Sequence, residues 1–157
     1  MTDRGRSACP WGPYRETTLV MPRGPESDAL RIDLSQTIGP AVRAAIEAIA
    51  GSRFAIVTAY NPYFLARGPS TAEENRRAHE RLRAELARLR LGHVEADGHA
   101  NGSPEHVERG FAIDCDTNTA RTLACEFGQD AFFSYEDGAF WIRPAMEPAK
   151  PPVRTAG

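Results

Sequence analysis

Two short polar runs, Thr58–Pro62 and Ser70–Asn75, contain residue types that suit a binding or catalytic site. The first follows an apolar segment and includes Asn61, and the second opens a helical pattern and includes Glu74 and Asn75. Amide and carboxylate groups pack poorly in a core, because each must find a hydrogen-bond partner when it is buried. The same groups can orient a polar ligand or transfer a proton. We therefore expect a polar site in the connection between a strand and the helix that follows it.

Hydrophobic periodicity predicts the elements that position these runs. Strands are predicted at 54–60, 93–97, 108–114, 131–135 and 139–143, and helices at 40–50, 70–91 and 116–127. The segment 54–60 is apolar nearly throughout, which is typical of a strand in the middle of a sheet. The core order is βαββαβ, with an extra C-terminal hairpin strand and an N-terminal helix. This order predicts an α+β, ferredoxin-like sandwich, although another α+β sandwich stays open.

Several element boundaries carry specific signals. Ser70 and Glu73 have the spacing of a capping box at the start of the second helix. Asp116 is a suitable N-cap for the third helix, and Gly128 is suited to the left-handed position after its end. Asp137-Gly138 predicts a tight hairpin between the last two strands.

The two ends of the chain differ in composition from the middle. Residues 1–29 are rich in Pro, Gly and Arg and predict a flexible arm, which could pack through Trp11 and Tyr14. Residues 30–144 are expected to form a single α+β domain. Residues 145–157 contain further prolines and predict a flexible tail.

The expected strand directions bring distant polar residues to one end of the sheet. The end of the first strand, the start of its helix, the loop between the second and third strands and the turn before the fourth strand should meet there. The candidate binding residues at these places are Asn61, Glu74, Asn75, Glu108, Gln129 and Asp130. Two interpretations stay open, a ligand-binding site and a hydrogen-bonded scaffold that only braces the loops.

Composition excludes several classes of protein. The chain has 157 residues, of which 41% are hydrophobic and 25% charged, as is typical of a soluble globular protein. A net charge of -2 argues against a strongly basic nucleic-acid binder. Three cysteines without C-x-x-C spacing fit a reducing compartment, and no apolar run of membrane-spanning length occurs. We therefore expect a cytoplasmic protein without a membrane partner.

No motif identifies a cofactor or a reaction. The chain has no P-loop, no G-x-G-x-x-G and no H-E-x-x-H. His99, Glu105, His106 and Glu108 match no closed metal site, so no metal and no cofactor is expected. Cys115 lies between two aspartates that should raise its pKa and make it a poor nucleophile. Whether the protein is an enzyme stays open.

The polar runs, taken with two later segments, resemble a known family. The residues that carry the resemblance are Thr58-Ala59-Tyr60-Asn61-Pro62, Ser70, Glu74-Asn75, Glu108 with Phe111, and Phe127-Gly128-Gln129-Asp130-Ala131. Over about residues 54–143 the chain resembles a family of small bacterial proteins catalogued as domain of unknown function 3293. The resemblance implies a bacterial origin and a stand-alone domain, and it supplies no activity. The long Pro/Gly/Arg-rich start departs from the family.

Three functions remain open at this point. The first is a small-molecule or nucleotide-like ligand site, where Glu74, Glu108 and Asp130 could also act as acid/base groups in hydrolysis. The second is a protein-interaction module, such as a regulator, an immunity-type inhibitor or a phage-defence accessory protein. The third is an RNA or ribosome-associated module that uses the Arg-rich helix 71–91, although nearby glutamates favour an ordinary solvated helix.

Overall fold

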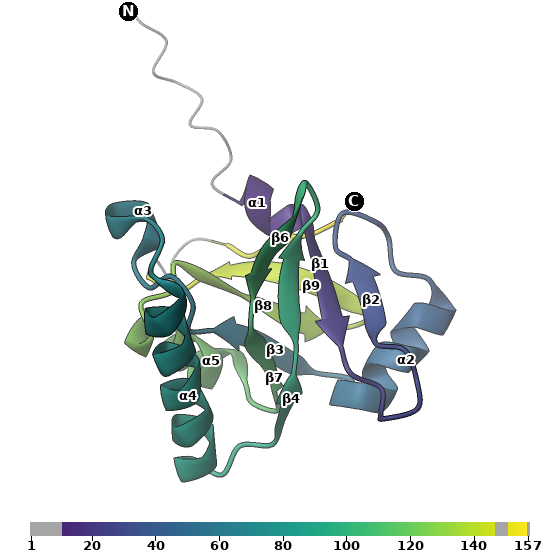
Figure 1. Ribbon diagram of the computed structural model, residues 1–157. Helices are drawn as coiled ribbons and strands as arrows, with labels where there is room; N and C mark the ends of the chain where they lie inside the picture. Colours follow the sequence, from purple (N-terminus) through teal and green to yellow (C-terminus); the bar gives the residue numbers. More distant parts are fainter. Residues whose placement is uncertain (1–10, 147–150, 157) are drawn as a thin grey trace, which may run out of the picture.

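The computed structural model of this chain describes residues 11–146 and 151–156. Its strands are β1 (Thr17–Met21), β2 (Leu30–Asp33), β3 (Phe54–Thr58), β4 (His93–Glu95), β5 (Asp97–Ala100), β6 (Ser103–Glu108), β7 (Gly110–Ile113), β8 (Ala131–Glu136), β9 (Ala139–Pro144) and β10 (Val153–Arg154). Its helices are α1 (Gly12–Arg15), α2 (Pro40–Ala50), α3 (Phe64–Arg67), α4 (Ala72–Arg88) and α5 (Thr117–Glu126). The described strands form two antiparallel sheets (Figure 1).

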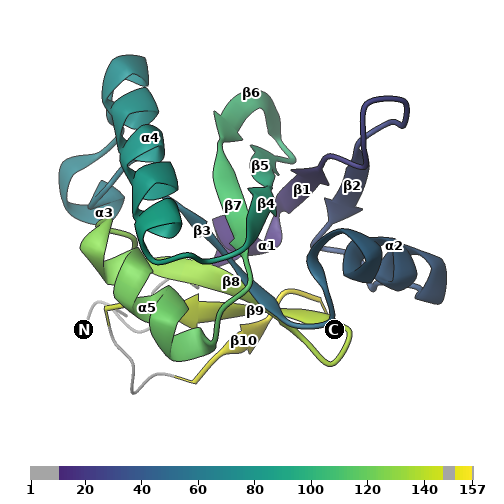
Figure 2. The same ribbon diagram turned by 90° about the horizontal axis from the view of Figure 1, so that it is seen from below.

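The larger sheet has the strand order β10-β9-β8-β3-β7-β4, and the smaller sheet has the order β2-β1-β5-β6. Helices α4 and α5 cover one face of the larger sheet, while β1, β2 and α2 lie on its other side (Figure 2). Side chains that alternate along β3 explain this layering. Ala55 and Val57 belong to the core under α4 and α5, whereas Phe54 and Ile56 belong to the core under the smaller sheet. Both faces of β3 are buried, which is why the strand is apolar nearly throughout.

The predicted α+β class is confirmed, and so is the central position of β3 between β8 and β7. The order β3–α4–β4–β7–α5–β8 along the chain follows the predicted βαββαβ order. In the sheet these four strands lie in the order β8-β3-β7-β4, and each neighbouring pair is antiparallel. The predicted helix 40–50 matches α2, with Pro40 in its first turn.

The smaller sheet was not predicted. The segment from Gly98 to His106 was expected to be a loop, but it contributes to the hairpin of β5 and β6. This hairpin continues β4 and β7, and the chain passes from one sheet to the other at Ala96 and Arg109. Gly110 permits the crossing because a Cβ there would lie 2.9 Å from the Val57 carbonyl oxygen and 3.1 Å from that of Ala96.

The prediction of a flexible arm is wrong for residues 17–21, which form β1 between β2 and β5. Leu19 and Met21 are fully buried and anchor this strand in the core. The predicted packing of the two aromatic residues is confirmed, since Tyr14 stacks edge-on against Trp11 and Phe133. The tail prediction is likewise wrong for β10, which pairs with β9. The rest of both predictions falls partly on residues 1–10, 147–150 and 157, outside the described residues.

Most of the predicted caps and turns at the element boundaries are confirmed. Asp116 caps α5 by accepting a hydrogen bond from the Thr119 backbone N–H at 2.7 Å. Gly128 has a φ of 67°, and Asp137 and Gly138 have φ values of 51° and 74°, as the predicted turns require. The capping box of α4 is displaced by one residue from the prediction, because it uses Thr71 and Glu74.

Candidate functional site

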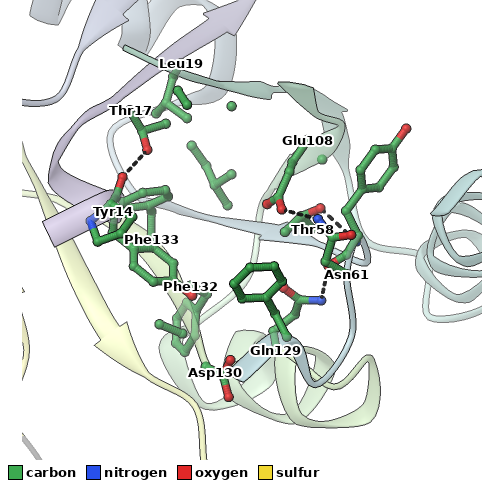
Figure 3. A pocket seen from close by; sticks show the side chains of 18 of the residues that line it. Tyr14, Thr17, Leu19, Thr58, Asn61, Glu108, Gln129, Asp130, Phe132 and Phe133 are labelled. Carbon is green, nitrogen blue, oxygen red and sulfur yellow. Dashed lines mark hydrogen bonds between the residues drawn. The ribbon is translucent and has the colours of Figure 1, made fainter. Parts of the chain in front are cut away.

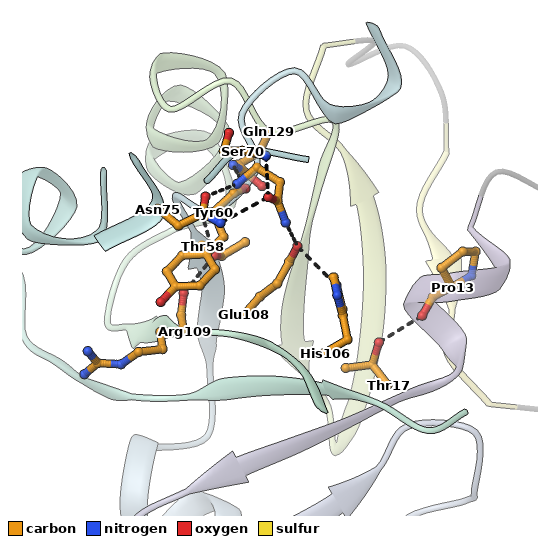
Figure 4. Close-up of polar contacts among 11 residues, drawn as sticks. Pro13, Thr17, Thr58, Tyr60, Ser70, Asn75, His106, Glu108, Arg109 and Gln129 are labelled. Carbon is orange, nitrogen blue, oxygen red and sulfur yellow. Dashed lines mark hydrogen bonds and ion pairs between the residues drawn. The ribbon is translucent and has the colours of Figure 1, made fainter. Parts of the chain in front are cut away.

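Asn61 joins the end of β3 to the start of α4. Its backbone N–H donates to Asn75 Oδ1 at 2.7 Å, and its own Oδ1 accepts from Asn75 Nδ2 at 3.1 Å. The same Oδ1 accepts from the Ser70 backbone N–H at 3.0 Å (Figure 4). Asn61 has a φ of 48°, a left-handed conformation that asparagine tolerates better than most residues. The polar runs therefore fold onto one another through a single asparagine.

The fourth bond of this asparagine reaches Glu108, at the end of β6. Asn61 Nδ2 donates to Glu108 Oε1 at 2.7 Å, and His106 Nε2 lies 3.8 Å from the same oxygen. The Glu108 side chain is 32% exposed. Burial raises the pKa of this carboxyl, while the hydrogen bond from Asn61 and the nearby His106 act to lower it. The carboxylate is thus fixed in orientation and partly buried.

Gln129 fixes the turn before β8 against the end of β3. Its Nε2 donates to the Tyr60 carbonyl oxygen at 3.0 Å and to that of Phe127 at 3.2 Å. Thr58 braces the same region from the other side, because its hydroxyl donates to the Arg109 carbonyl oxygen at 2.7 Å. These bonds connect β3, β8 and the crossing between β6 and β7.

A cavity of about 370 Å³ lies between the two sheets beside these polar groups (Figure 3). Its lining is mostly apolar and includes Trp11, Tyr14, Leu19, Ile56, Phe64, Leu65, Phe132 and Phe133. α1 and β1 form one wall, β3 and β8 form another, and β5 and β6 supply a third. This volume lies in the range of pockets that enclose small organic molecules.

The charged side chains of the cavity lining are acidic. Glu108 and Asp130 both line the cavity, and no Lys or Arg is found in its lining among residues 11–146 and 151–156. Figure 3 shows Asp130 at the edge of the cavity opposite Thr17. The pKa of Tyr14 is raised mainly by burial, and the charges of Asp130 and Glu108 raise it further. The negative charges of both carboxylates therefore reach the Tyr14 hydroxyl inside this cavity.

The structure separates the six predicted site residues into three groups. Asn61, Glu108, Gln129 and Asp130 line the cavity. Asn75 is buried behind Asn61 and holds it in place. Glu74 is exposed and accepts a hydrogen bond from the Thr71 backbone N–H, so its carboxylate stabilises the start of α4 outside the lining.

The sequence did not reveal the apolar half of the cavity. Tyr14 and Leu19 come from the segment expected to be an arm, and Phe133 was assigned only to the core. The alternation in Thr17–Met21 was a signal for a strand, but Pro- and Gly-rich neighbours obscured it.

Cys115 lies away from this cavity and behaves as the sequence predicted. Burial, followed by the charges of Asp116 and Asp114, raises its pKa to about 11. Its thiol is therefore protonated at neutral pH and is a weak nucleophile.

Replacing Glu108 with glutamine tests the electrostatics of the cavity. The E108Q side chain keeps a carbonyl oxygen for Asn61 and removes the charge. Burial raises the pKa of Glu108 above its ordinary value of 4.5. Below that pH the carboxyl is protonated in the folded and the unfolded protein, and its burial costs no ionisation energy. As the pH rises through the folded-state pKa, the carboxyl ionises and the folded state loses stability relative to the unfolded state. We expect E108Q to have a higher free energy of unfolding than the wild type at pH 7. This difference should shrink towards about pH 4, where an ordinary glutamate carboxyl becomes protonated. Urea unfolding across this pH range measures the difference, and a constant gain at every pH would contradict the assignment.

The fold and the cavity define an α+β protein in which two stacked antiparallel sheets partly enclose a carboxylate. Residues 57–132 match the family model described as "Protein of unknown function (DUF3293)". This match confirms the resemblance that the sequence indicated, and the matched segment runs from β3 into β8 and contains all six predicted residues. No curated protein and no solved structure matches the chain.

Two kinds of feature are absent from the part of the chain that the structure describes. None of its helices combines the length and the apolar character needed to cross a membrane. Nor are three or more His, Cys, Asp or Glu side chains gathered there in a way that could hold a metal ion.

Proposed function

We propose that this protein binds a small organic molecule in the cavity between its two sheets. The observation that carries the proposal is the Glu108 carboxylate, which Asn61 holds by a 2.7 Å hydrogen bond at the wall of a mostly apolar cavity of about 370 Å³. Burying a carboxylate, even in part, has an energetic cost unless the group has a partner. A few oriented polar groups in an apolar pocket are the usual composition of a ligand site.

The hydrogen bonds around Asn61 support both interpretations that the sequence left open. The bonds to Asn75 and Ser70 stay within the protein and brace the loops. The bond to Glu108 differs, because it orients a carboxylate that also lines the cavity. We therefore propose that the scaffold serves the site, with Asn61, Glu108, Gln129 and Asp130 as its polar residues and Asn75 as their support.

The ferredoxin-like arrangement and the cellular location are also part of this proposal. We propose that β3–α4–β4–β7–α5–β8 is a ferredoxin-like unit, supported by the order β8-β3-β7-β4. We also propose the cytoplasm of a bacterium as the location, in agreement with the free thiols of Cys115 and Cys125.

A protein-interaction module is the second candidate. Three neighbouring side chains support it, since Tyr63, Phe64 and Leu65 are 45%, 48% and 73% exposed. An RNA-binding role has less support, because four arginines of α4 are paired with glutamates on the surface. Phe64 and Leu65 also line the cavity, so their exposure equally fits an entrance for a small molecule.

Filling the cavity tests the proposed function. The chain has two tryptophans, of which Trp11 lines the cavity, so a Trp141→Phe background leaves a single fluorescent reporter at the site. We expect phenethyl alcohol, a neutral apolar probe, to change Trp11 fluorescence in a saturable way. The additional Ala100→Phe substitution should abolish this response, because Ala100 lines the cavity and the larger ring occupies it.

The matched control is Ala84→Phe, which adds the same ring to α4 on the other side of the larger sheet. This variant should keep the wild-type response. An equal response in the Ala100→Phe and Ala84→Phe proteins would show that the probe binds elsewhere and would overturn the proposed function.

A further inference from the structure

The charge of the cavity lining limits the chemical class of a ligand more than the cavity volume does. Glu108 and Asp130 line it, and neither carboxylate forms an ion pair with Lys or Arg among the described residues. The arginine that follows Glu108 in the sequence is engaged elsewhere, since Arg109 pairs with Glu95 at 3.0 Å. The interior thus has a negative potential without a fixed counter-ion in the part of the chain that is described.

Glu108 presents one oxygen to the protein and leaves the other for a ligand. Its Oε1 accepts from Asn61 Nδ2. Within residues 11–146 and 151–156, no hydrogen bond reaches its Oε2. A carboxylate accepts hydrogen bonds at both oxygens, so Oε2 is available to a donor that enters the cavity.

Aromatic rings line the same cavity as this carboxylate. Tyr14 packs against Phe133 with ring centroids 5.8 Å apart, and both line the cavity together with Trp11. The electron-rich faces of such rings also attract cations. Of the described residues that line the cavity, an anionic ligand would meet two carboxylates and no basic side chain other than His106, which is half exposed.

We infer that the ligand of this cavity is an organic cation, an apolar or aromatic body that carries one protonated amine, with the amine bound by Glu108. This inference rests on the proposed function and adds the chemical class of the ligand. In it, the apolar body lies against Tyr14, Ile56 and Phe133, and the amine donates to Glu108 Oε2. Asp130 adds to the negative potential from the far edge of the cavity.

The raised pKa of Glu108 is consistent with this pairing. Burial makes the charged form of this carboxyl unfavourable. A ligand cation at hydrogen-bond distance stabilises the charged form and offsets that cost. A neutral hydrogen-bond donor compensates less, and an anionic ligand does not compensate at all.

Three probes of one scaffold and different charge test the inference. Phenethylamine is cationic at neutral pH, phenethyl alcohol is neutral and phenylacetate is anionic. Titration of each into the Trp141→Phe protein, followed by Trp11 fluorescence, gives three dissociation constants. We expect phenethylamine to bind about tenfold more tightly than phenethyl alcohol, the effect of one favourable charge pair. Phenylacetate should bind most weakly.

The Glu108→Gln substitution separates charge from shape. It should reduce the preference for phenethylamine over phenethyl alcohol to about twofold or less, because the shape of the site is kept and the charge is lost. Phenethyl alcohol is the reference in this ratio, so a general effect of the substitution on the site acts on both probes and cancels. A second variant, Asp130→Asn, should lower the preference by a smaller factor, since Asp130 acts from a greater distance.

Each outcome decides between the two proposals. Equal binding of the three probes to the wild type would overturn the cation inference and leave the proposed function standing, as would tighter binding of phenylacetate. A preference for phenethylamine that survives Glu108→Gln would overturn the role assigned to Glu108. If phenethyl alcohol and phenethylamine both fail to bind, the proposed function falls and the inference falls with it.

Discussion

The Asn61→Asp substitution should destabilise the protein by roughly 3 kcal/mol or more at pH 7. It replaces the Nδ2 group that donates to Glu108 at 2.7 Å with an oxygen, so two acceptors face each other at the wall of the cavity. The bonds from Ser70 and Asn75 to Oδ1 are kept, which isolates the Asn61–Glu108 contact from the loop scaffold. Urea unfolding monitored by circular dichroism measures the loss.

The matched rescue is the double variant N61D/E108Q. It reverses the direction of the same hydrogen bond, because the glutamine amide then donates to the introduced carboxylate. We expect most of the lost stability to return, which gives a large coupling energy in a double-mutant cycle. Additive effects of the two substitutions would show that Asn61 and Glu108 do not form this bond in solution.

The Gly110→Ala substitution should cost about 3 kcal/mol of stability. Gly110 lies where the chain leaves the smaller sheet and enters the larger one, and it lines the cavity. The added methyl group would lie 2.9 Å from the Val57 carbonyl oxygen and 3.1 Å from that of Ala96. Both contacts are with backbone atoms, which cannot move without disturbing the pairing of β7 with β3.

Gly98→Ala is the control for this prediction. A Cβ at Gly98 would lie 3.4 Å from the Thr17 methyl group and 3.9 Å from the Glu108 carbonyl oxygen, and both are ordinary van der Waals contacts. We expect a loss of about 1 kcal/mol or less, as for a substitution without a clash. Similar losses at the two glycines, measured by urea unfolding, would contradict the close approach of the backbones at Gly110.

The core of the fold was predictable because its signals are local. The periodicity of β3, α4, β7, α5 and β8 gave the element order, and strand directions follow from the order alone. Those directions predicted that the end of β3, the start of α4 and the turn before β8 would meet. The structure places Asn61, Asn75 and Gln129 together for this reason.

The start of α4 shows the limit of local signals. Ser70 and Thr71 are both good capping residues, and each has a glutamate three residues later. The backbone N–H of Ser70 bonds to Asn61 Oδ1, a tertiary contact that leaves Thr71 as the N-cap. Glu73, the expected partner of Ser70, instead pairs with Arg76 and Arg77. The sequence alone could not distinguish these two registers.

The smaller sheet escaped prediction for a different reason. Residues 97–108 include Gly, Pro, Asp and Asn, which disfavour strands in isolation. β5 is stabilised by pairing with β1, which lies about eighty residues earlier in the chain. Pairing over such a separation leaves no local signature in the sequence. The cavity lies between the sheets, so its apolar walls could not be predicted without this pairing, although its polar residues could.

A two-dimensional ¹H–¹⁵N NMR titration with phenethyl alcohol tests the central claim most directly, because it reports where the probe binds. We expect saturable shifts of the backbone signals of residues that line the cavity, such as Ile56, Gly98 and Ala131. The signals of Ala84 and Glu126, in the surface groove beside α4 and α5, should stay in place. Shifts confined to that groove, or the absence of saturable shifts in the cavity, would contradict a ligand site between the sheets.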